Sequence, residues 1–251
     1  AGKPMPFIDR AVYSLERESI PVWTKFLQGY YDRSAVGQDS FDQVVNLGAG
    51  GELELTEAMR SRGMRLSSSV MSSIFYTGLN MLDDTVGGDG PKQRALRQAI
   101  AIAIDQEESI AIFQNGLGLA MQGPLPPGIF GYRDGEAGIN RYVYGWQAGR
   151  PQRLGIERAR ALLKTAGYPN GRDAASGRPL VLYFDSMASG PDAKSYMDWL
   201  RKQFGKLGVQ LVVRSTDYNR FQDKMRRGQA QIYQWGWNAD YPDPENFLFL
   251  F

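Results

Sequence analysis

The feature that most limits the folds open to this chain is a regular alternation of amphipathic and apolar segments between Ile156 and Trp237. Apolar residues at helical spacing predict helices, and short runs rich in β-branched residues between them predict strands. The predicted elements are a helix over 156–167, a strand over 179–185, a helix over 191–208, a strand over 209–215, a helix over 218–228 and a strand over 230–237. Because helices that connect the strands of a sheet pack over its faces, this order predicts a mixed α/β fold with a layered sheet.

The residues before this alternation also predict helices and extended segments. Within 94–105, apolar residues recur at helical spacing, and Asp105 followed three residues later by Glu108 has the pattern of a capping box. A second helix is therefore expected to begin at Asp105. Residues 64–82 are rich in strand-forming residues, and residues 7–17 alternate in the manner of a strand.

The composition excludes several kinds of chemistry. The 251 residues include no histidine and no cysteine, so a Ser-His-Asp triad, a thiolate nucleophile, a disulfide and a His- or Cys-based metal site are all impossible within this chain. The net charge of +2, from 29 basic and 27 acidic residues, gives no electrostatic reason to expect a nucleic-acid partner. No apolar run approaches the roughly 18 residues that a membrane-spanning helix needs. Catalysis by carboxylates, Lys, Tyr or Ser stays open.

Five motifs in the second part of the chain resemble one known family and occur in its order. They are "LRQAIAIAID" before an acidic helix, "GPLPPGIFGY", "ARALLKTAGYPNG", "WLRKQFGKLGVQLVVRSTDYNRF" and "GWNADYPDPENF". The family is the extracellular solute-binding proteins of family 5, the peptide/nickel or oligopeptide-binding class that serves ATP-binding-cassette (ABC) importers. The resemblance covers residues 90–250, and residues 1–80 match more loosely. A full-length member would be longer and begin with a signal peptide, so we expect this chain to be a C-terminal part of such a protein.

The resemblance implies a periplasmic-binding-protein type II fold, in which two lobes close like a hinge on a ligand. We expect residues 1–82 to hold a remnant of the first lobe and a first crossing segment (64–82), residues 83–230 to form the second lobe, and residues 231–251 to cross back to the first lobe. The implied ligand is a peptide or a related small molecule, and the implied partner is an inner-membrane ABC permease. The implied location is the periplasm, or the cell exterior with a membrane tether. We expect a monomer with no cofactor, no metal, no nucleic-acid partner and no catalytic residue.

The candidate ligand-binding residues gather in "WGWNADYPDPENF", residues 235–247. By the resemblance, Asp240 matches the Asp of a Trp-x-x-Asp element that pairs with the α-amino group of the ligand. A buried carboxylate needs such a cation, because an unpaired buried charge is costly. Trp237 would form an apolar wall of the cleft and Trp235 a second one, since Trp offers a large flat surface and one N–H donor.

Each of these residues could instead have a purely structural role. Trp235 and Trp237 lie two residues apart on a predicted strand, so they face the same side and could both pack in the core. We favour the core for Trp235 and the cleft for Trp237. Asp240, which precedes Tyr-Pro, could instead serve only as a turn residue.

Residues outside this stretch give two further ligand-binding candidates and one structural pair. Asn80 lies in a predicted crossing segment, where it would either hydrogen-bond the ligand backbone or shape the hinge. Tyr76 is the other candidate in that segment. Arg97 and Asp105 are eight residues apart and would share one face of a continuous helix, so we interpret them as support for the fold through a salt bridge or a cap.

Two other kinds of protein remain compatible with the residues alone. A carboxylate-based glycoside hydrolase would use two acidic groups, and Asp240 and Asp243 are the obvious pair. They are only three residues apart in a Pro-rich turn, and nothing in the sequence fixes either one as the acid. A non-catalytic sugar-binding module would use the same aromatic and acidic stretch as a platform for a sugar ring.

Overall fold

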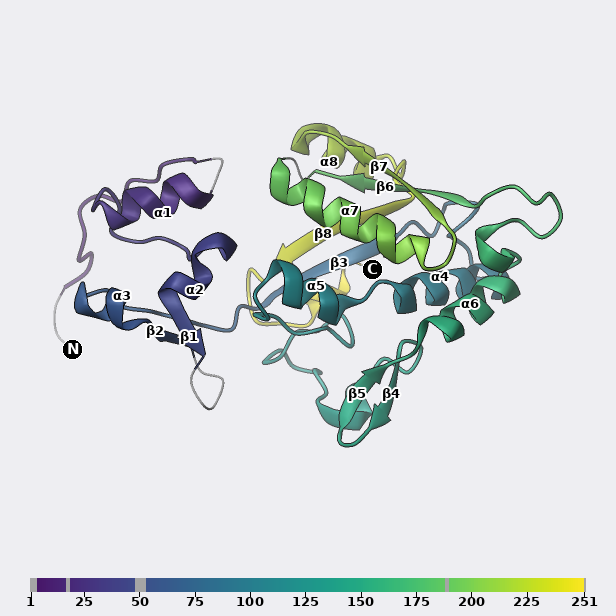
Figure 1. The fold of residues 1–251 in the computed structure, drawn as a ribbon, viewed down its shortest axis with the longest axis horizontal. Coiled ribbons are helices and arrows are strands. Elements are labelled where there is room, and N and C mark those ends of the chain that lie inside the picture. The colour runs from purple at the N-terminus through teal and green to yellow at the C-terminus, as the bar shows by residue number, and fades with distance from the viewer. Residues whose placement is uncertain (1–3, 17–18, 48–52, 188–189, 251) are drawn as a thin grey trace. The chain divides into compact units, whose positions relative to one another are not determined.

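The computed structural model describes residues 4–16, 19–47, 53–187 and 190–250 (Figure 1). By its internal contacts the chain divides into two compact units, Ala1–Ser69 and Val70–Phe251. Each unit has a hydrophobic core of its own. The predicted assignment of residues 1–82, 83–230 and 231–251 to two lobes and their crossing segments stays a prediction.

The smaller unit is a set of short elements around a small apolar core. Its elements are α1 (Ser19–Leu27), a 3₁₀ turn (Gln38–Ser40), α2 (Phe41–Val44), the antiparallel strands β1 (Val45–Leu47) and β2 (Leu53–Leu55), and α3 (Glu57–Ser61). Its buried core consists of Trp23, Phe41, Val44 and Val45. Residues 7–16 form no regular element and are almost entirely exposed, so the strand predicted over 7–17 is wrong in its described part. An alternating pattern makes a strand only where another strand is available to pair with it.

The larger unit is built on a four-stranded mixed sheet in the order β3-β8-β6-β7. The strands are β3 (Ser73–Leu79), β6 (Val181–Ser186), β7 (Gln210–Ser215) and β8 (Ile232–Asn238). The helices are α4 (Pro91–Ala103), α5 (Gln106–Phe113), α6 (Ile156–Thr165), α7 (Pro191–Gly205), α8 (Tyr218–Arg226) and α9 (Glu245–Leu248). A separate hairpin consists of β4 (Tyr144–Gln147) and β5 (Arg150–Arg153), and short 3₁₀ turns lie at Gly135–Gly138 and Pro169–Gly171.

The main core lies on one face of this sheet. Leu182 and Phe184 of β6 are fully buried and belong to one cluster with apolar side chains of α4, α6 and α7. Figure 1 shows α7 lying across the sheet, with α4 and α6 next to each other. β6 runs parallel to both β7 and β8, as expected for strands joined by helical crossovers. The mixed α/β fold that the alternation predicts is therefore confirmed, and each predicted element between 156 and 237 is present.

The region around Asp105 shows whether Arg97 and Asp105 support the fold through a salt bridge or through a helix cap. α4 ends at Ala103, and the Asp105 carboxylate caps α5 by accepting a hydrogen bond of 2.9 Å from the Glu108 backbone N–H. Arg97 instead donates to two backbone carbonyls of the loop before α4. The predicted cap at Asp105 is confirmed, whereas the premise of one continuous helix through both residues is wrong. Within the described ranges, no helix is long and apolar enough to cross a membrane.

Candidate functional site

The candidate site lies on the strand pair β3 and β8, in the larger unit. The two strands are antiparallel, and their register places Ile74 opposite Trp237, Tyr76 opposite Trp235, and Gly78 opposite Tyr233. Directly opposite residues of an antiparallel pair project from the same face of the sheet. The structure therefore brings three of the predicted residues, Tyr76, Trp235 and Trp237, onto one face. The two tryptophans face the same side, as their spacing indicates.

Gly78 is required for the close packing of this aromatic face. A Cβ atom added at Gly78 would overlap the ring of Tyr233, which lies across the strand. Burial raises the pKa of Tyr233 above its ordinary value. Burial also raises the pKa of Tyr76, and the nearby Tyr233 adds to that shift. Both phenols are therefore neutral at physiological pH, so they offer hydrogen bonding and apolar ring surface rather than charge.

Helix α8 supports one part of this face. Its fully buried Phe221 packs edge-on against Trp235, with ring centroids 5.2 Å apart. Lys224 of the same helix pairs with the buried carboxylate of Asp185, which is aligned with Tyr233 across β6 and β8. The contact with Phe221 covers part of the Trp235 ring, which is only partly buried. Whether Trp235 serves the core or a ligand stays a prediction.

Trp237 packs with a smaller apolar cluster near the end of β8. The cluster has Ile74, Ile129 and Phe247 as its buried members, with Tyr76 and Trp237 packed against them. The Trp237 ring also lies edge-on to Phe249, with centroids 5.3 Å apart. Its indole Nε1–H donates a hydrogen bond of 2.8 Å to the side chain of Asn246. Trp237 can therefore offer a ligand its ring surface, but its single N–H donor is already used.

Asp240 lies in the turn that follows β8. Its side chain is exposed, and among the described residues its carboxylate has no hydrogen bond or ion pair. The backbone is held: the Asp240 N–H donates to the Asn246 side chain at 3.1 Å, and the preceding Ala239 N–H donates to the Ser72 carbonyl at 2.9 Å. A fixed turn thus presents a carboxylate that is open to a cation from outside the chain.

Asn80 lies at the opposite end of the strand pair. Its side-chain amide donates to the carbonyls of Gly228 and Ala230 at 2.9 and 2.8 Å, and its oxygen accepts from the Leu82 backbone N–H at 3.0 Å. The seven-residue strand between Asn80 and Asp240 spans about 20 Å. The structure therefore does not bring Asn80 to Asp240, and it gives Asn80 a role in joining the ends of β3 and β8. A ligand role for Asn80 stays a prediction, and it would require a long ligand.

Asn246 is a residue of this site that no sequence pattern predicts. It lies in the short helix α9 and is 2% exposed, and its side-chain oxygen accepts both of the hydrogen bonds that hold Trp237 and Asp240. The neighbouring acids behave as turn and surface residues: the Asp243 carboxylate accepts from the Glu245 N–H at 2.9 Å, and both are exposed. In the sequence, Asn246 is marked only by its position just after the Asp-Pro turn. That position does not reveal its burial, which depends on tertiary packing.

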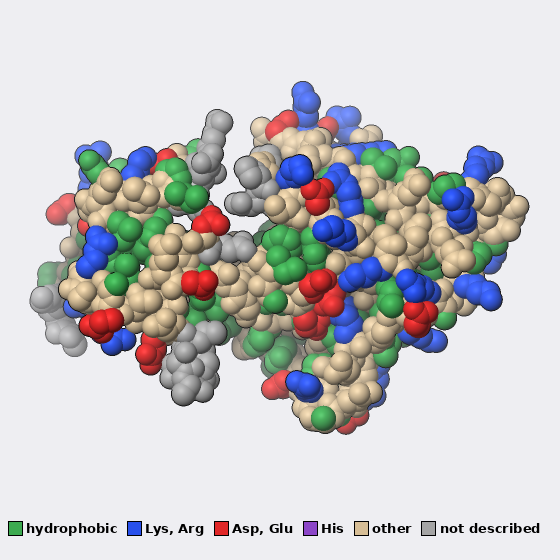
Figure 2. All heavy atoms as spheres, in the orientation of Figure 1, with side chains coloured by type: hydrophobic (Ala, Val, Ile, Leu, Met, Phe, Trp, Pro, Cys, Tyr) green, Lys and Arg blue, Asp and Glu red, His purple; other side chains and the backbone are tan. Residues whose placement is uncertain are grey.

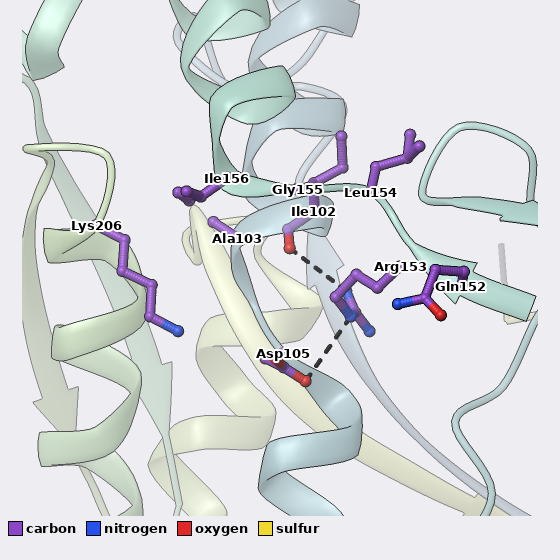
Figure 3. A pocket seen from close by; sticks show the side chains of 9 residues that line it. All are labelled: Ile102, Ala103, Asp105, Gln152, Arg153, Leu154, Gly155, Ile156 and Lys206. Carbon is purple, nitrogen blue, oxygen red and sulfur yellow. Dashed lines mark hydrogen bonds and ion pairs between the residues drawn. The ribbon is translucent and has the colours of Figure 1, made fainter.

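A hollow of about 280 Å³ lies elsewhere in the larger unit, between the end of α4 and the start of α6 (Figure 3). Its charged groups already have partners in the chain. Arg153 pairs with Glu107 at 2.8 Å, and Lys206 lies 3.6 Å from Glu108. Figure 3 shows Arg153 pointing between Asp105 and the Ile102 carbonyl. None of the predicted ligand-binding residues lines this hollow, so we interpret it as part of the scaffold.

In the larger unit, the charged side chains form neither a patch of one sign on the face that Figure 2 shows nor, among the described residues, a group that could hold a metal ion. On the face of the larger unit that Figure 2 shows, basic and acidic side chains are intermixed rather than gathered by sign. Among the residues that the structure describes, no group of three or more acidic side chains is arranged to hold a metal ion.

The fold of this chain resembles those of solved structures of binding proteins. The dipeptide-binding protein of Pseudoalteromonas sp. SM9913, solved in complex with Met-Leu, matches with a TM-score of 0.62 over 94% of this chain and 39% of that one, at 20% identity. The OppA protein of Burkholderia pseudomallei matches with a TM-score of 0.62 over 92% of this chain and 40% of that one, at 18% identity. The fold is thus that of the periplasmic binding proteins, as the resemblance implies.

The family follows from the sequence comparison. The model described as "Bacterial extracellular solute-binding proteins, family 5 Middle" matches residues 19–251. The chain belongs to this family of solute-binding proteins. Heme-binding protein A of Haemophilus influenzae is 29% identical over 61% of this chain and 25% of its own length. The dipeptide-binding protein of Escherichia coli is 26% identical over 61% of this chain and 25% of its own length. The chain therefore spans about a quarter of the length of these curated relatives.

Proposed function

We propose that the native protein carrying this sequence is the substrate-binding component of an ABC-type importer. It binds a peptide or a related small solute in a cleft between two lobes and delivers it to a permease in the inner membrane. The observation that carries this proposal is the exposed Asp240 carboxylate in a member of a solute-binding family. Its backbone N–H shares the Asn246 acceptor with Trp237, which lies on the aromatic face of β3 and β8.

In this proposal Asp240 pairs with the α-ammonium group of a peptide. An exposed carboxylate costs little before the ligand arrives, and closure of the cleft strengthens the ion pair by removing water. The ring of Trp237 forms an apolar wall next to it, and Tyr76 extends that wall along the same face. Trp235, which packs against Phe221, contributes the part of its ring that Phe221 does not cover.

The names of the relatives favour a peptide as the ligand. One curated relative is named for dipeptide binding, and one similar structure holds the dipeptide Met-Leu. Another relative is named for heme binding, so membership of the family leaves room for other solutes. A free amino terminus is the feature of a peptide that Asp240 would recognise.

The location and assembly that we propose follow from this role. A protein that captures solutes for an importer works outside the inner membrane, in the periplasm or tethered to the outer side of a membrane. We propose a monomer, because one cleft and one permease complete the cycle. The role needs no catalytic residue. The hydrolase alternative would need Asp243 as a second free carboxylate, but Asp243 accepts the Glu245 N–H as a turn residue.

Isothermal titration calorimetry on the full-length native protein tests the proposal. The ligands are a library of di- to pentapeptides, the same library with acetylated amino termini, and a set of oligosaccharides. We expect heat from the free peptides and much less from the acetylated ones. Binding of an oligosaccharide with no heat from any peptide would overturn the proposal.

A further inference from the structure

A buried amide connects the two residues on which the proposed site depends. Asn246 is 2% exposed, although asparagine is a mostly exposed residue type in folded proteins. It lies beside the fully buried Phe247 in α9, which follows the Asp-Pro turn directly. Burying a polar side chain is costly unless it is hydrogen-bonded, so the partners of Asn246 indicate what its burial achieves.

The partners are one side-chain donor and one backbone donor. The Asn246 Oδ1 atom accepts from the Trp237 Nε1–H at 2.8 Å and from the Asp240 backbone N–H at 3.1 Å. A carbonyl oxygen has two lone pairs, and these two bonds use both. One atom therefore fixes the ring of Trp237 relative to the backbone from which the Asp240 carboxylate projects.

We infer that Asn246 is a positioning residue for ligand recognition, an inference that rests on the proposed role of Asp240. It sets the place of the Asp240 carboxylate relative to the aromatic wall, and it sets the tilt of the Trp237 ring. It does not touch the ligand. Because the Trp237 N–H is held by Asn246, Trp237 presents only its ring surface to the ligand, and the negative charge that pairs with the ligand's ammonium group comes from Asp240.

The local packing makes Asn246 suited to this task. Its own backbone N–H donates to the Asp243 carbonyl at 3.1 Å, which ties α9 to the turn. Phe247 anchors the same helix in the apolar cluster with Ile74 and Ile129. The Asn246 backbone is therefore fixed by the turn on one side and by the packing of Phe247 on the other. Through its side chain, Asn246 links the apolar cluster to the exposed turn. Groups held in this way by packing and hydrogen bonds keep a binding site close to its productive geometry.

The test compares three substitutions in the full-length native protein. Asn246→Leu keeps the volume but removes the acceptor, and Asn246→Ser keeps a polar group that is too short to reach both donors. Asn246→Asp keeps an acceptor oxygen for both bonds. Asn219→Leu is the matched control, because Asn219 is an exposed residue of α8. Each variant is measured for thermal stability and for affinity toward the tightest-binding peptide of the library and its N-acetyl form.

We expect Asn246→Leu and Asn246→Ser to lower the preference for the free amino terminus on the order of tenfold, since both remove the hydrogen bond that holds the Asp240 backbone N–H. Asn246→Asp is expected to keep that preference even where stability falls, because a buried carboxylate is costly but still accepts both bonds. Asn219→Leu is expected to change neither quantity.

The inference would be overturned if the preference for the free amino terminus fell in proportion to the loss of thermal stability in all three variants, whether or not they keep an acceptor. It would also be overturned if Asn246→Leu and Asn246→Ser both left that preference unchanged. If Asn246→Leu does not fold, Asn246→Ser and Asn246→Asp still give the comparison. These outcomes leave the proposed function standing. A native protein that binds acetylated and free peptides equally well would instead overturn the role of Asp240, and the inference with it.

Discussion

Replacing the carboxylate of Asp240 by an amide isolates the charge on which the proposed site depends. Asp240→Asn keeps the size and shape of the side chain. The turn is held through the backbone, by the bonds from Asp240 N–H to Asn246 and from Ala239 N–H to Ser72, and neither involves the carboxylate. The side chain is exposed and has no partner among the described residues. We therefore expect the free energy of unfolding to change by less than about 0.5 kcal/mol.

The loss of binding energy can be estimated from the exposure of the group. Two unit charges 4 Å apart attract by about 1 kcal/mol in water and by about 4 kcal/mol at the effective dielectric constant near a protein surface. Because Asp240 is exposed in this chain, its attraction to a cation is near the lower of these two energies. Closure on a ligand removes water and moves the attraction toward the higher one. The asparagine oxygen still accepts a hydrogen bond from an ammonium group. We expect a net loss of at least about 1.4 kcal/mol, a tenfold weaker affinity.

Calorimetry at low and at physiological salt measures this loss. The N-acetyl peptide is the control, because its amino terminus has no charge for Asp240 to pair with. Asp240→Asn should weaken the binding of the free peptide and leave the acetylated peptide unaffected, and the difference should shrink as salt rises. Equal affinity of the variant and the native protein for the free peptide would show that the Asp240 charge does not pair with the ligand.

Three further predictions concern the scaffold of the full-length protein. Asn80→Leu leaves two backbone carbonyls without their donor and should lower the free energy of unfolding by about 2 kcal/mol in urea titrations, whereas Asn219→Leu should not. Gly78→Ala should cost about 1–3 kcal/mol through its clash with Tyr233, and an added Tyr233→Leu substitution should recover part of that loss; additive losses would contradict this. Burial acts to raise the pKa of Glu107, but hydrogen bonds from a tyrosine and an arginine outweigh it and hold the pKa below its ordinary value. The ionised Glu107 therefore stabilises the fold above about pH 4.5, and this contribution is lost as the pH falls further. Glu107→Gln should therefore flatten the acid side of the stability curve, and an unchanged slope would show that this contact contributes nothing.

The sequence predicts the larger unit well because its signals are local. Between 156 and 237 each helix shows a 3.6-residue period and each strand a short β-branched run, and the structure has each of these elements near its predicted bounds. The cap at Asp105 is equally local, since it depends on one side chain and the N–H three residues later. The prediction over 7–17 is wrong because a strand also needs a partner, which a local pattern does not supply.

The site was predicted in part for the same reason. Strand periodicity places Trp235 and Trp237 on one face, and the register adds Tyr76 to them. The role of Asn246 depends on the folding of α9 against Ile74 and Ile129, which are distant in the sequence, so no local pattern distinguishes it from a surface asparagine. Asn80 shows the converse: its position in a predicted crossing segment leaves a ligand contact and a role in the hinge both open, and in the structure its amide hydrogen-bonds to the backbone just before β8.

The most direct test of the central claim is native mass spectrometry of the full-length protein after incubation with equal amounts of a free peptide library and an oligosaccharide library. We expect a mass increase that matches one peptide with a free amino terminus, and the loss of that increase in Asp240→Asn. A protein that stays without a ligand, or that takes up a sugar instead, would contradict the claim that this chain belongs to a peptide-binding component of an importer.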